Sequence, residues 1–148
     1  MDNTIVGYTA GIIDGEGCIT ISFQKYSVKR NRSRHRLTVD VANTNRVLLE
    51  WLQKNWGGHI YESKPQKIIH KIGYHWKLQG INTIELLRAV LPYLILKKEQ
   101  ALLALAFLRT MWGCHGTQSL PLDIIQERFS IEAKMKLLNR KGALPFAS

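Results

Sequence analysis

The stretch TAGIIDGEGCI, residues 9–19, carries three glycines and two acidic residues inside an otherwise apolar run. With Gly7 just before it, the glycines at 7, 11 and 15 are spaced four residues apart, so they lie on one ridge of a helix. Each glycine in a helix interior costs about 0.5–1 kcal/mol relative to alanine. Small residues on one ridge let a second backbone approach closely. The pattern therefore predicts a helix at residues 3–15 that packs against another helix, which is most simply the same helix of a second chain around a two-fold axis.

The composition points to a basic globular protein. The chain has 148 residues, enough for one domain with a core, and we expect a single domain over residues 1–148. Its 21 Lys and Arg against 11 Asp and Glu give a net charge of +10, which favours nucleic acid as a partner. A soluble protein from a host with a basic proteome would carry the same charge. The two cysteines lack CxxC spacing and the apolar runs are short, so we expect an intracellular, soluble protein of the cytoplasm or an organelle matrix, with no membrane partner.

Strand-like alternation follows the glycine-rich helix. Residues 18–28 and 36–42 alternate apolar and polar side chains on either side of a basic tip, KRNRSRHR at 29–36, and this pattern predicts a long hairpin. The side chains expected to face inward are Ile19, Ile21, Phe23, Leu37, Val39 and Val41. A second hairpin is expected from residues 59–63 and a strand within 68–79, with a turn near Lys64 and Pro65.

Helical patterns occupy the rest of the chain. Residues 44–56 place Val47, Leu48, Trp51 and Leu52 on one face, and the glycines at 57 and 58 end that helix. Asn82 and Glu85 have the spacing of a capping box for a helix that reaches about residue 91. Two more helices are expected, at 96–112 and from Pro121 to about 139. The order α-β-β-α-β-β-α-α-α predicts an α+β fold with an antiparallel sheet and helices on one face.

Glu16 is the first candidate functional residue. It follows the C-terminal end of the helix, where the macrodipole is negative and a carboxylate is disfavoured. A two-fold axis would bring a second Glu16 close by, and a hard divalent cation would relieve the resulting repulsion. The alternative interpretation is that Gly15 and Gly17 are ordinary C-caps and that Glu16 is solvated.

The nine residues TAGIIDGEG, 9–17, resemble the signature of the LAGLIDADG homing endonucleases, with matches at Ala10, Gly11, Ile13, Asp14 and Gly17. Thr9 departs from the usual leading Leu. The segments NTNRVLLEWLQKNWGG (43–58) and LLRAVLPYLILKKEQ (86–100) are similar to later segments of the family, so the resemblance covers about residues 5–110. One motif per chain implies the homodimeric branch.

The resemblance implies an αββαββα fold, with a saddle-shaped antiparallel sheet and extra C-terminal helices. It also implies an intron-encoded, site-specific endonuclease that hydrolyses double-stranded DNA at a long pseudo-palindromic target and leaves staggered 3′ overhangs. The implied cofactor is Mg²⁺, or another divalent cation such as Mn²⁺ or Ca²⁺. An RNA maturase and a cleavage-inactive DNA-binding regulator of the same fold are the alternatives. Intact Glu16 and Lys97 argue against the regulator.

Residue roles carry over by position in the motifs. Glu16 matches the metal-binding catalytic acid, with the Gly15 carbonyl beside it, and Lys97 matches the active-site lysine. Without the family, Lys97 would be interpreted as a solvated lysine, and Lys98 is an adjacent competitor. Asn43 stands where the family usually has Gln, so a water-positioning role is expected of its amide. The residues expected at the dimer interface are Gly7, Ala10, Gly11 and Asp14; Asp14 is also expected to have a structural role at the helix end and is a second choice as a ligand.

The outward face of the sheet is the expected DNA-binding surface. Amides, hydroxyls and arginines suit base edges in the major groove, while cations in the loop suit phosphates. A strand of about ten residues spans roughly 33 Å, close to one turn of DNA per subunit. An ordinary solvated sheet face would have a similar composition. The expected DNA-binding residues are Ser22, Gln24, Tyr26, Lys29, Arg30, Arg32, Arg34, Arg36, Thr38, Asp40, Tyr61, Ser63, His75 and Lys77.

Overall fold

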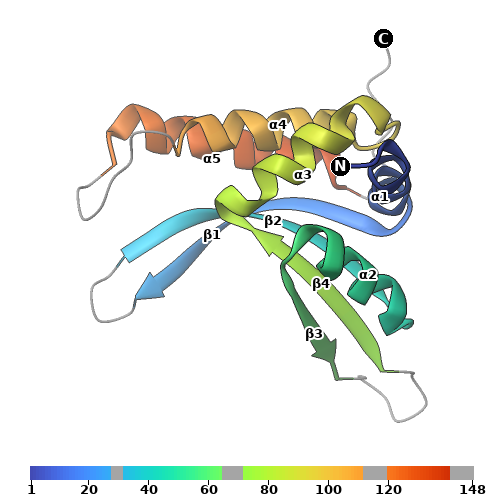
Figure 1. Cartoon of the computed structure of the whole chain (residues 1–148). Coiled ribbons are helices and arrows are strands. Elements are labelled where there is room, and N and C mark those ends of the chain that lie inside the picture. The colour runs from blue at the N-terminus through green and yellow to red at the C-terminus, as the bar shows by residue number, and fades with distance from the viewer. Residues whose placement is uncertain (28–31, 65–71, 112–119, 141–148) are drawn as a thin grey trace.

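A four-stranded antiparallel sheet and the helices that cover one of its faces make up the fold (Figure 1). The computed structural model describes residues 1–27, 32–64, 72–111 and 120–140. Its elements, in chain order, are α1 (Asn3–Glu16), β1 (Gly17–Ser27), β2 (Arg32–Asn43), α2 (Arg46–Trp56), β3 (His59–Ser63), β4 (Gly73–Gln79), the 3₁₀ turn η1 (Gly80–Asn82), α3 (Thr83–Val90), the 3₁₀ turn η2 (Leu91–Tyr93), α4 (Lys98–Arg109) and α5 (Leu122–Leu138). This order of helices and strands confirms the α+β class expected from the sequence.

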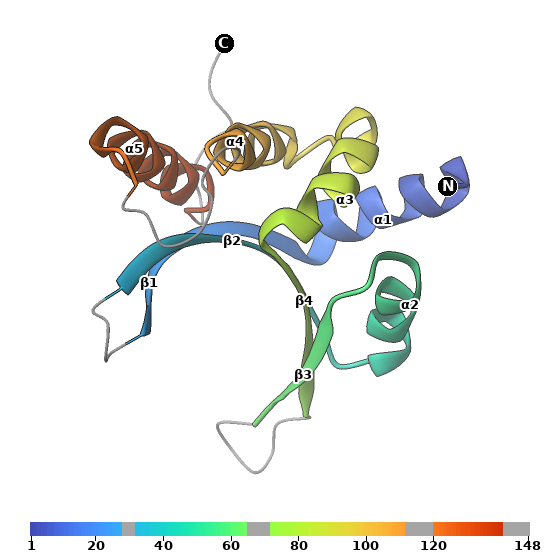
Figure 2. The same cartoon turned by 60° about the vertical axis from the view of Figure 1, so that its left-hand side comes forward.

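The sheet is built from two hairpins joined side by side. Its strand order is β1-β2-β4-β3, so the long strand β2 pairs with β1 along one edge and with β4 along the other. Figure 2 shows that the sheet bends into an arch, with its concave side open and the helices on the outer side. The curvature agrees with the saddle shape that the family resemblance implies.

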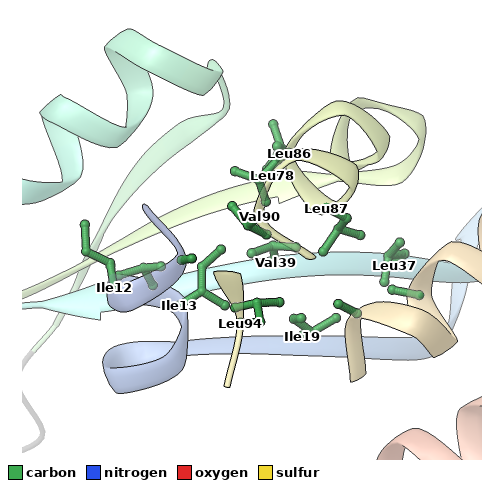
Figure 3. Close-up of a cluster of buried hydrophobic side chains, with 14 of the residues drawn as sticks. Ile12, Ile13, Ile19, Leu37, Val39, Leu78, Leu86, Leu87, Val90 and Leu94 are labelled. Atoms are coloured by element: carbon green, nitrogen blue, oxygen red, sulfur yellow. The ribbon is translucent and has the colours of Figure 1, made fainter. Parts of the chain in front are cut away.

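The core lies between the sheet and the helices. The alternation in β1 and β2 places Ile19, Leu37 and Val39 on the convex face, where all three are fully buried. Figure 3 shows these side chains against Ile13 of α1 and Leu87 of α3. The core therefore fixes α1 and the first hairpin as one unit.

The structure corrects two helix details. Val47 is 70% exposed, and Leu49 takes its place in the core with Leu52, because α2 begins at Arg46 and its first turn faces solvent. Asn82 forms no capping hydrogen bond, because it lies in η1, which leads directly into α3. The hydroxyl of Thr83 donates to the Gly80 carbonyl instead, at 2.7 Å.

Three other expectations shift by small amounts. The N-cap of α1 is Asp2, whose Oδ1 accepts from the backbone N of Thr4 at 2.9 Å, rather than Asn3 or Thr4. Phe23 lies on the expected face but is half exposed, because it sits beyond the core. Pro121 is the N-cap of α5 and precedes its first turn. The expected turn at Pro65 and the first part of the expected strand from 68 lie outside the described residues.

Candidate functional site

The candidate site lies where α1 runs into β1 without a loop residue between them. Gly17 ends the helix, and its backbone N–H donates to the carbonyls of Ile12 and Ile13. A Cβ at position 17 would lie 2.7 Å from the Cα of Ile13, so the junction requires glycine. The side chain of Glu16, one residue earlier, is exposed at this junction.

Asn43 holds the Glu16 carboxylate. Its Nδ2 donates to Glu16 Oε2 at 2.6 Å, and its Oδ1 accepts from the backbone N of Asn45 at 2.7 Å. The amide is therefore oriented from one side and presents its donor to the acid from the other. The end of β2 and the end of α1 meet through this contact, which the sequence did not predict.

The Asp14 carboxylate accepts hydrogen bonds from the chain's own backbone. Its Oδ2 accepts from the N–H of Ile95 at 2.8 Å, while its Oδ1 accepts from those of Leu96 at 3.2 Å and Lys97 at 3.0 Å. The carboxylate thus caps the segment that leads into α4. This agrees with a structural role for Asp14 at the end of α1, and its place at the dimer interface stays a prediction.

Lys97 reaches back to the C-terminal end of α1. Its Nζ donates to the carbonyls of Ile13 at 2.8 Å and Asp14 at 3.0 Å, where the last turn of a helix leaves carbonyls without intrahelical partners. Burial lowers the pKa of the Lys97 ammonium, while the nearby charge of Asp14 acts in the opposite direction. Lys98, in contrast, is exposed in the first turn of α4. The structure therefore places the Nζ of Lys97 close to the motif that carries Glu16.

The oxygen donors at the junction suit a hard divalent cation, but one chain supplies few of them. The Glu16 carboxylate and the Gly15 carbonyl are the kind of ligand that Mg²⁺, Mn²⁺ and Ca²⁺ bind. Within the described ranges, no group of three or more His, Cys, Asp or Glu residues is arranged to hold a metal ion. Because Mg²⁺ keeps several waters and binds one or two carboxylates, Glu16 and the Gly15 carbonyl could supply part of such a site.

One face of α1 is open. Apart from its own helix, a Cβ built on Gly11 or Gly15 would meet no atom of the described residues within 4 Å, and the neighbouring Tyr8 is 55% exposed. Gly7 is half-buried, and a Cβ there would lie 4.0 Å from the Tyr93 ring. Ala10 is only 1% exposed and packs in the chain's own core, so the open ridge does not include its side chain. The open ridge thus consists of Gly11 and Gly15, with Gly7 at its edge.

Polar side chains face the concave side of the first hairpin in paired rows. Ser22 lies opposite Arg36 and Gln24 opposite Arg34 in the register of β1 and β2. Thr38 is only 9% exposed, and Gln79 Nε2 donates to its hydroxyl at 3.4 Å, so we leave it out of the contact surface. The side chains of Tyr26 and Arg32, and all of Lys29 and Arg30, lie outside the described part of the structure.

A second polar cluster joins Asp40 of β2 to the second hairpin. His75 Nδ1 lies 2.9 Å from Asp40 Oδ1, and Lys77 Nζ lies 3.5 Å from Asp40 Oδ2. Lys77 also lies over the exposed ring of Tyr61, 5.9 Å from its centroid. Asp40 is therefore engaged with its neighbours, and it orients His75 and Lys77. Ser63 is half-buried at the far end of β3.

Cys18 is a site residue that the sequence analysis missed. It is exposed, lies opposite Asp40 in the register of β1 and β2, and interacts electrostatically with Lys97. Although Cys18 is exposed, partial desolvation raises the pKa of its thiol, and the nearby charge of Lys97 lowers that pKa. Its alternation with the inward-facing Ile19 was the signal that could have placed it on the concave side.

Comparisons with known proteins bear on the family and the fold of this chain. The family model described as LAGLIDADG endonuclease matches residues 9–98. Comparison with curated protein sequences returned no match. No helix in the described part of the chain has the length and apolar character needed to cross a membrane.

Solved structures share the fold at low sequence identity. The homing endonuclease I-CvuI, in complex with its target, is 22% identical, with a TM-score of 0.73 over 97% of this chain and 87% of that chain. The archaeal intron-encoded homing endonuclease I-Vdi141I, complexed with DNA, is 19% identical, with a TM-score of 0.77 over 99% of this chain and 91% of that chain. I-SmaMI, bound to cleaved DNA, is 20% identical, with a TM-score of 0.70 over 95% of this chain and 45% of that chain.

Proposed function

This chain belongs to the LAGLIDADG endonuclease family, and we propose that it is a site-specific endonuclease of double-stranded DNA that works as a homodimer. The observation that carries the proposal is the position of Glu16. Its exposed carboxylate lies where the open ridge of α1 runs into β1, and Asn43 at the end of β2 donates to it. A carboxylate at that place can hold a divalent cation together with the same carboxylate of a second chain, and the cation can then contact a bound polyanion.

The open ridge of α1 supports the dimer. Gly11 and Gly15 leave space for another backbone, as small residues do wherever helices pack closely. A two-fold axis through this ridge would bring the two Glu16 side chains together. Each chain would then supply the carboxylate that the other lacks.

The residues present fit a divalent cation, held by the Glu16 carboxylate and the Gly15 carbonyl of each chain. Such a cation activates water and stabilises the leaving oxygen in phosphodiester hydrolysis. One protein of similar fold, I-CvuI, was solved in the presence of Ca²⁺ and of Mg²⁺, which supports a divalent cation as an occupant. Asn43 orients the Glu16 carboxylate, and Lys97 places a positive charge where the negative charge of the phosphate develops.

The concave face of the sheet is the proposed DNA-binding surface. The net charge of +10 favours a polyanion, and the arginines, amides and hydroxyls along both hairpins suit base edges. Two copies around a two-fold axis would read two half-sites, so the target would be long and pseudo-palindromic. One active site from each chain would cut one strand each, and the family resemblance implies that the cuts are staggered and leave 3′ overhangs.

Substitution of Glu16 by Gln tests the catalytic assignment. Glu16→Gln keeps the size of the side chain and removes its charge, so it should abolish cleavage of the target in Mg²⁺ and retain DNA binding. Lys97→Met should slow cleavage by orders of magnitude with little loss of binding, while the matched control Lys98→Met should have a much smaller effect. Full cleavage by Glu16→Gln would contradict the proposal, and promotion of intron splicing without DNA cleavage by the wild type would favour the maturase.

Substitution of Gly11 by Leu tests the dimer. The larger side chain should separate the two α1 helices, so sedimentation should show monomers and cleavage should be lost. Lys54→Leu adds the same side chain to the exposed face of α2 and should leave the dimer intact. A wild-type protein that binds DNA as a monomer would contradict the shared site.

A further inference from the structure

A buried polar contact joins the last helix to the first hairpin. His35 Nε2 and Glu132 Oε2 lie 2.7 Å apart, and the two side chains are only 3% and 9% exposed. Glu132 Oε1 also accepts from Lys136 Nζ at 2.6 Å. A hydrogen bond to an ionised group is short and directional, and leaving it unmade in a buried place is costly. The contact therefore fixes one point of β2 against α5.

An aromatic layer and a second hydrogen bond extend this contact along the hairpin. The ring of Phe129 lies 4.5 Å from that of His35 and 5.2 Å from that of Phe23, which stands opposite His35 in β1. Further along the chain, just past α5, Asn139 Nδ2 donates to the Ile19 carbonyl at 2.8 Å. Figure 2 shows α5 lying across the outer side of β1 and β2. The helix is thus attached to the hairpin at two separate places.

The position of His35 in its strand gives the contact a consequence for the opposite face. Successive side chains of a strand point to opposite sides, so the neighbours of His35, Arg34 and Arg36, project toward the concave face. Fixing His35 on the convex side fixes the backbone from which both arginines start. These are the arginines that the proposed function assigns to base edges.

We propose that α5 braces the β1–β2 hairpin and that the His35–Glu132 pair is a positioning contact for base recognition, an inference that rests on the proposed function. Hydrogen bonds to base edges depend on distance and angle, whereas attraction to phosphates tolerates a shift of the backbone. Loss of the brace should therefore reduce discrimination between bases more than total affinity. The pair never touches DNA, and it acts through Arg34 and Arg36.

Three variants of the protein distinguish a positioning role of the His35–Glu132 pair from an effect on folding stability. Glu132→Leu removes the acceptor of the His35 bond, Glu132→Gln keeps an acceptor oxygen, and Lys136→Met removes only the outer partner of Glu132. We expect Glu132→Leu to lose about tenfold in discrimination at the base pairs where Arg34→Ala and Arg36→Ala also lose it. Glu132→Gln and Lys136→Met should keep the wild-type preference. The measurement is binding to a library of target variants.

Hydrogen exchange of the DNA-free protein tests the brace independently of binding. Amides of β1 and β2 should exchange about tenfold faster in Glu132→Leu than in Glu132→Gln, while those of β4 stay unchanged. If Glu132→Leu does not fold, the double variant His35→Leu with Glu132→Met takes its place, because it removes both polar groups together.

Two results would overturn the brace. One is an unchanged base preference in a folded variant without the pair; the other is equally faster exchange in all four strands. A wild-type protein without any base preference would contradict the proposed function instead, and the exchange rates would then still decide whether α5 braces the hairpin.

Discussion

The two hairpins of the sheet present similar polar chemistry on the concave side but are supported in different ways. Strands β1 and β2 have 11 and 12 residues, and their convex face packs against α1 at both strands and against α2, α3, α4 and α5 at one strand or the other. Strands β3 and β4 have 5 and 7 residues, and α2 is the helix that packs against both of them. Within the described residues, five helices therefore support the first hairpin, whereas α2 is the main support of the second.

Trp76 shows where the second hairpin is held. Its ring is fully buried, and its Nε1 donates to the Gly57 carbonyl at 2.8 Å. The next residue, Gly58, has a φ of +86°, and a Cβ there would lie 2.6 Å from the Lys77 carbonyl oxygen. The turn before β3 and the side chain of β4 are thus fitted to each other at one point. A fault at that point should therefore disturb the second hairpin first, and it should also weaken the shared core, because Trp76 pairs with Val41 of β2.

The largest effect should follow from removing this point of support. Trp76→Ala should lower the free energy of unfolding by about 3–5 kcal/mol, because it opens a cavity and leaves the Gly57 carbonyl without its donor. Urea unfolding measures the change, and Tyr61→Ala, an exposed ring on the same hairpin, is the control. A loss below about 1 kcal/mol would mean that the second hairpin does not depend on Trp76.

A base-specific effect should distinguish the two hairpins next. Arg36→Ala should cost about 1–3 kcal/mol of discrimination at particular base pairs, and Lys77→Ala should affect a different set, because the two residues lie on different hairpins. Binding to a library of target variants gives both profiles. Overlapping profiles would place the two hairpins on the same base pairs and remove the distinction.

A smaller effect on DNA affinity, independent of base sequence, is expected from the basic stretch between β1 and β2. Arg30→Ala should weaken binding to target and random DNA alike and lower the salt dependence by about one unit, since the expected contact is to phosphate. Titrations at several salt concentrations measure the slope. Relaxed preference at one base pair would show instead that Arg30 reads bases as Arg34 and Arg36 are expected to do.

The smallest effect concerns pH and the brace. Burial raises the pKa of Glu132, but the hydrogen bonds from Lys136 and His35 outweigh it and hold that pKa below its usual range. A carboxylate with a lowered folded-state pKa stabilises the protein above its unfolded pKa of about 4.3, and this stability is lost as the pH falls through the folded value. The difference in unfolding free energy between wild type and Glu132→Gln should therefore shrink on acidification. Glu127→Gln, an exposed change on the same helix, should show no such trend.

The order of elements and the buried strand face could be predicted from the sequence, because both follow from local patterns of apolar, polar and glycine residues. Ile19, Leu37 and Val39 alternate with polar residues, and all three are buried as expected. Glycines 57 and 58 end α2 as expected, with φ values of +76° and +86°. Such signals depend on neighbours in the chain and on the period of the strand or helix.

The contacts that shape the site could not be predicted in this way. Asp14 and Ile95 are 81 residues apart in sequence, and His35 and Glu132 are 97 apart. The buried face of α5 includes Arg128 and Glu132, so its apolar periodicity is weak and gave no sign of what it packs against. Glu16 was a candidate from its place at the helix end and from the family motif, but its hydrogen bond with Asn43 depends on how two distant element ends meet.

The direct passage from α1 to β1 limits how the chain can change in length. Helix α1 ends at Glu16 and β1 begins at Gly17, so no spare residue can absorb an insertion or a deletion. One added residue would reverse the alternation of β1, turning Ile19 and Ile21 outward and the polar side chains inward. New target preferences can therefore arise here by substitution, whereas a change in length would exchange the inner and outer faces of the strand.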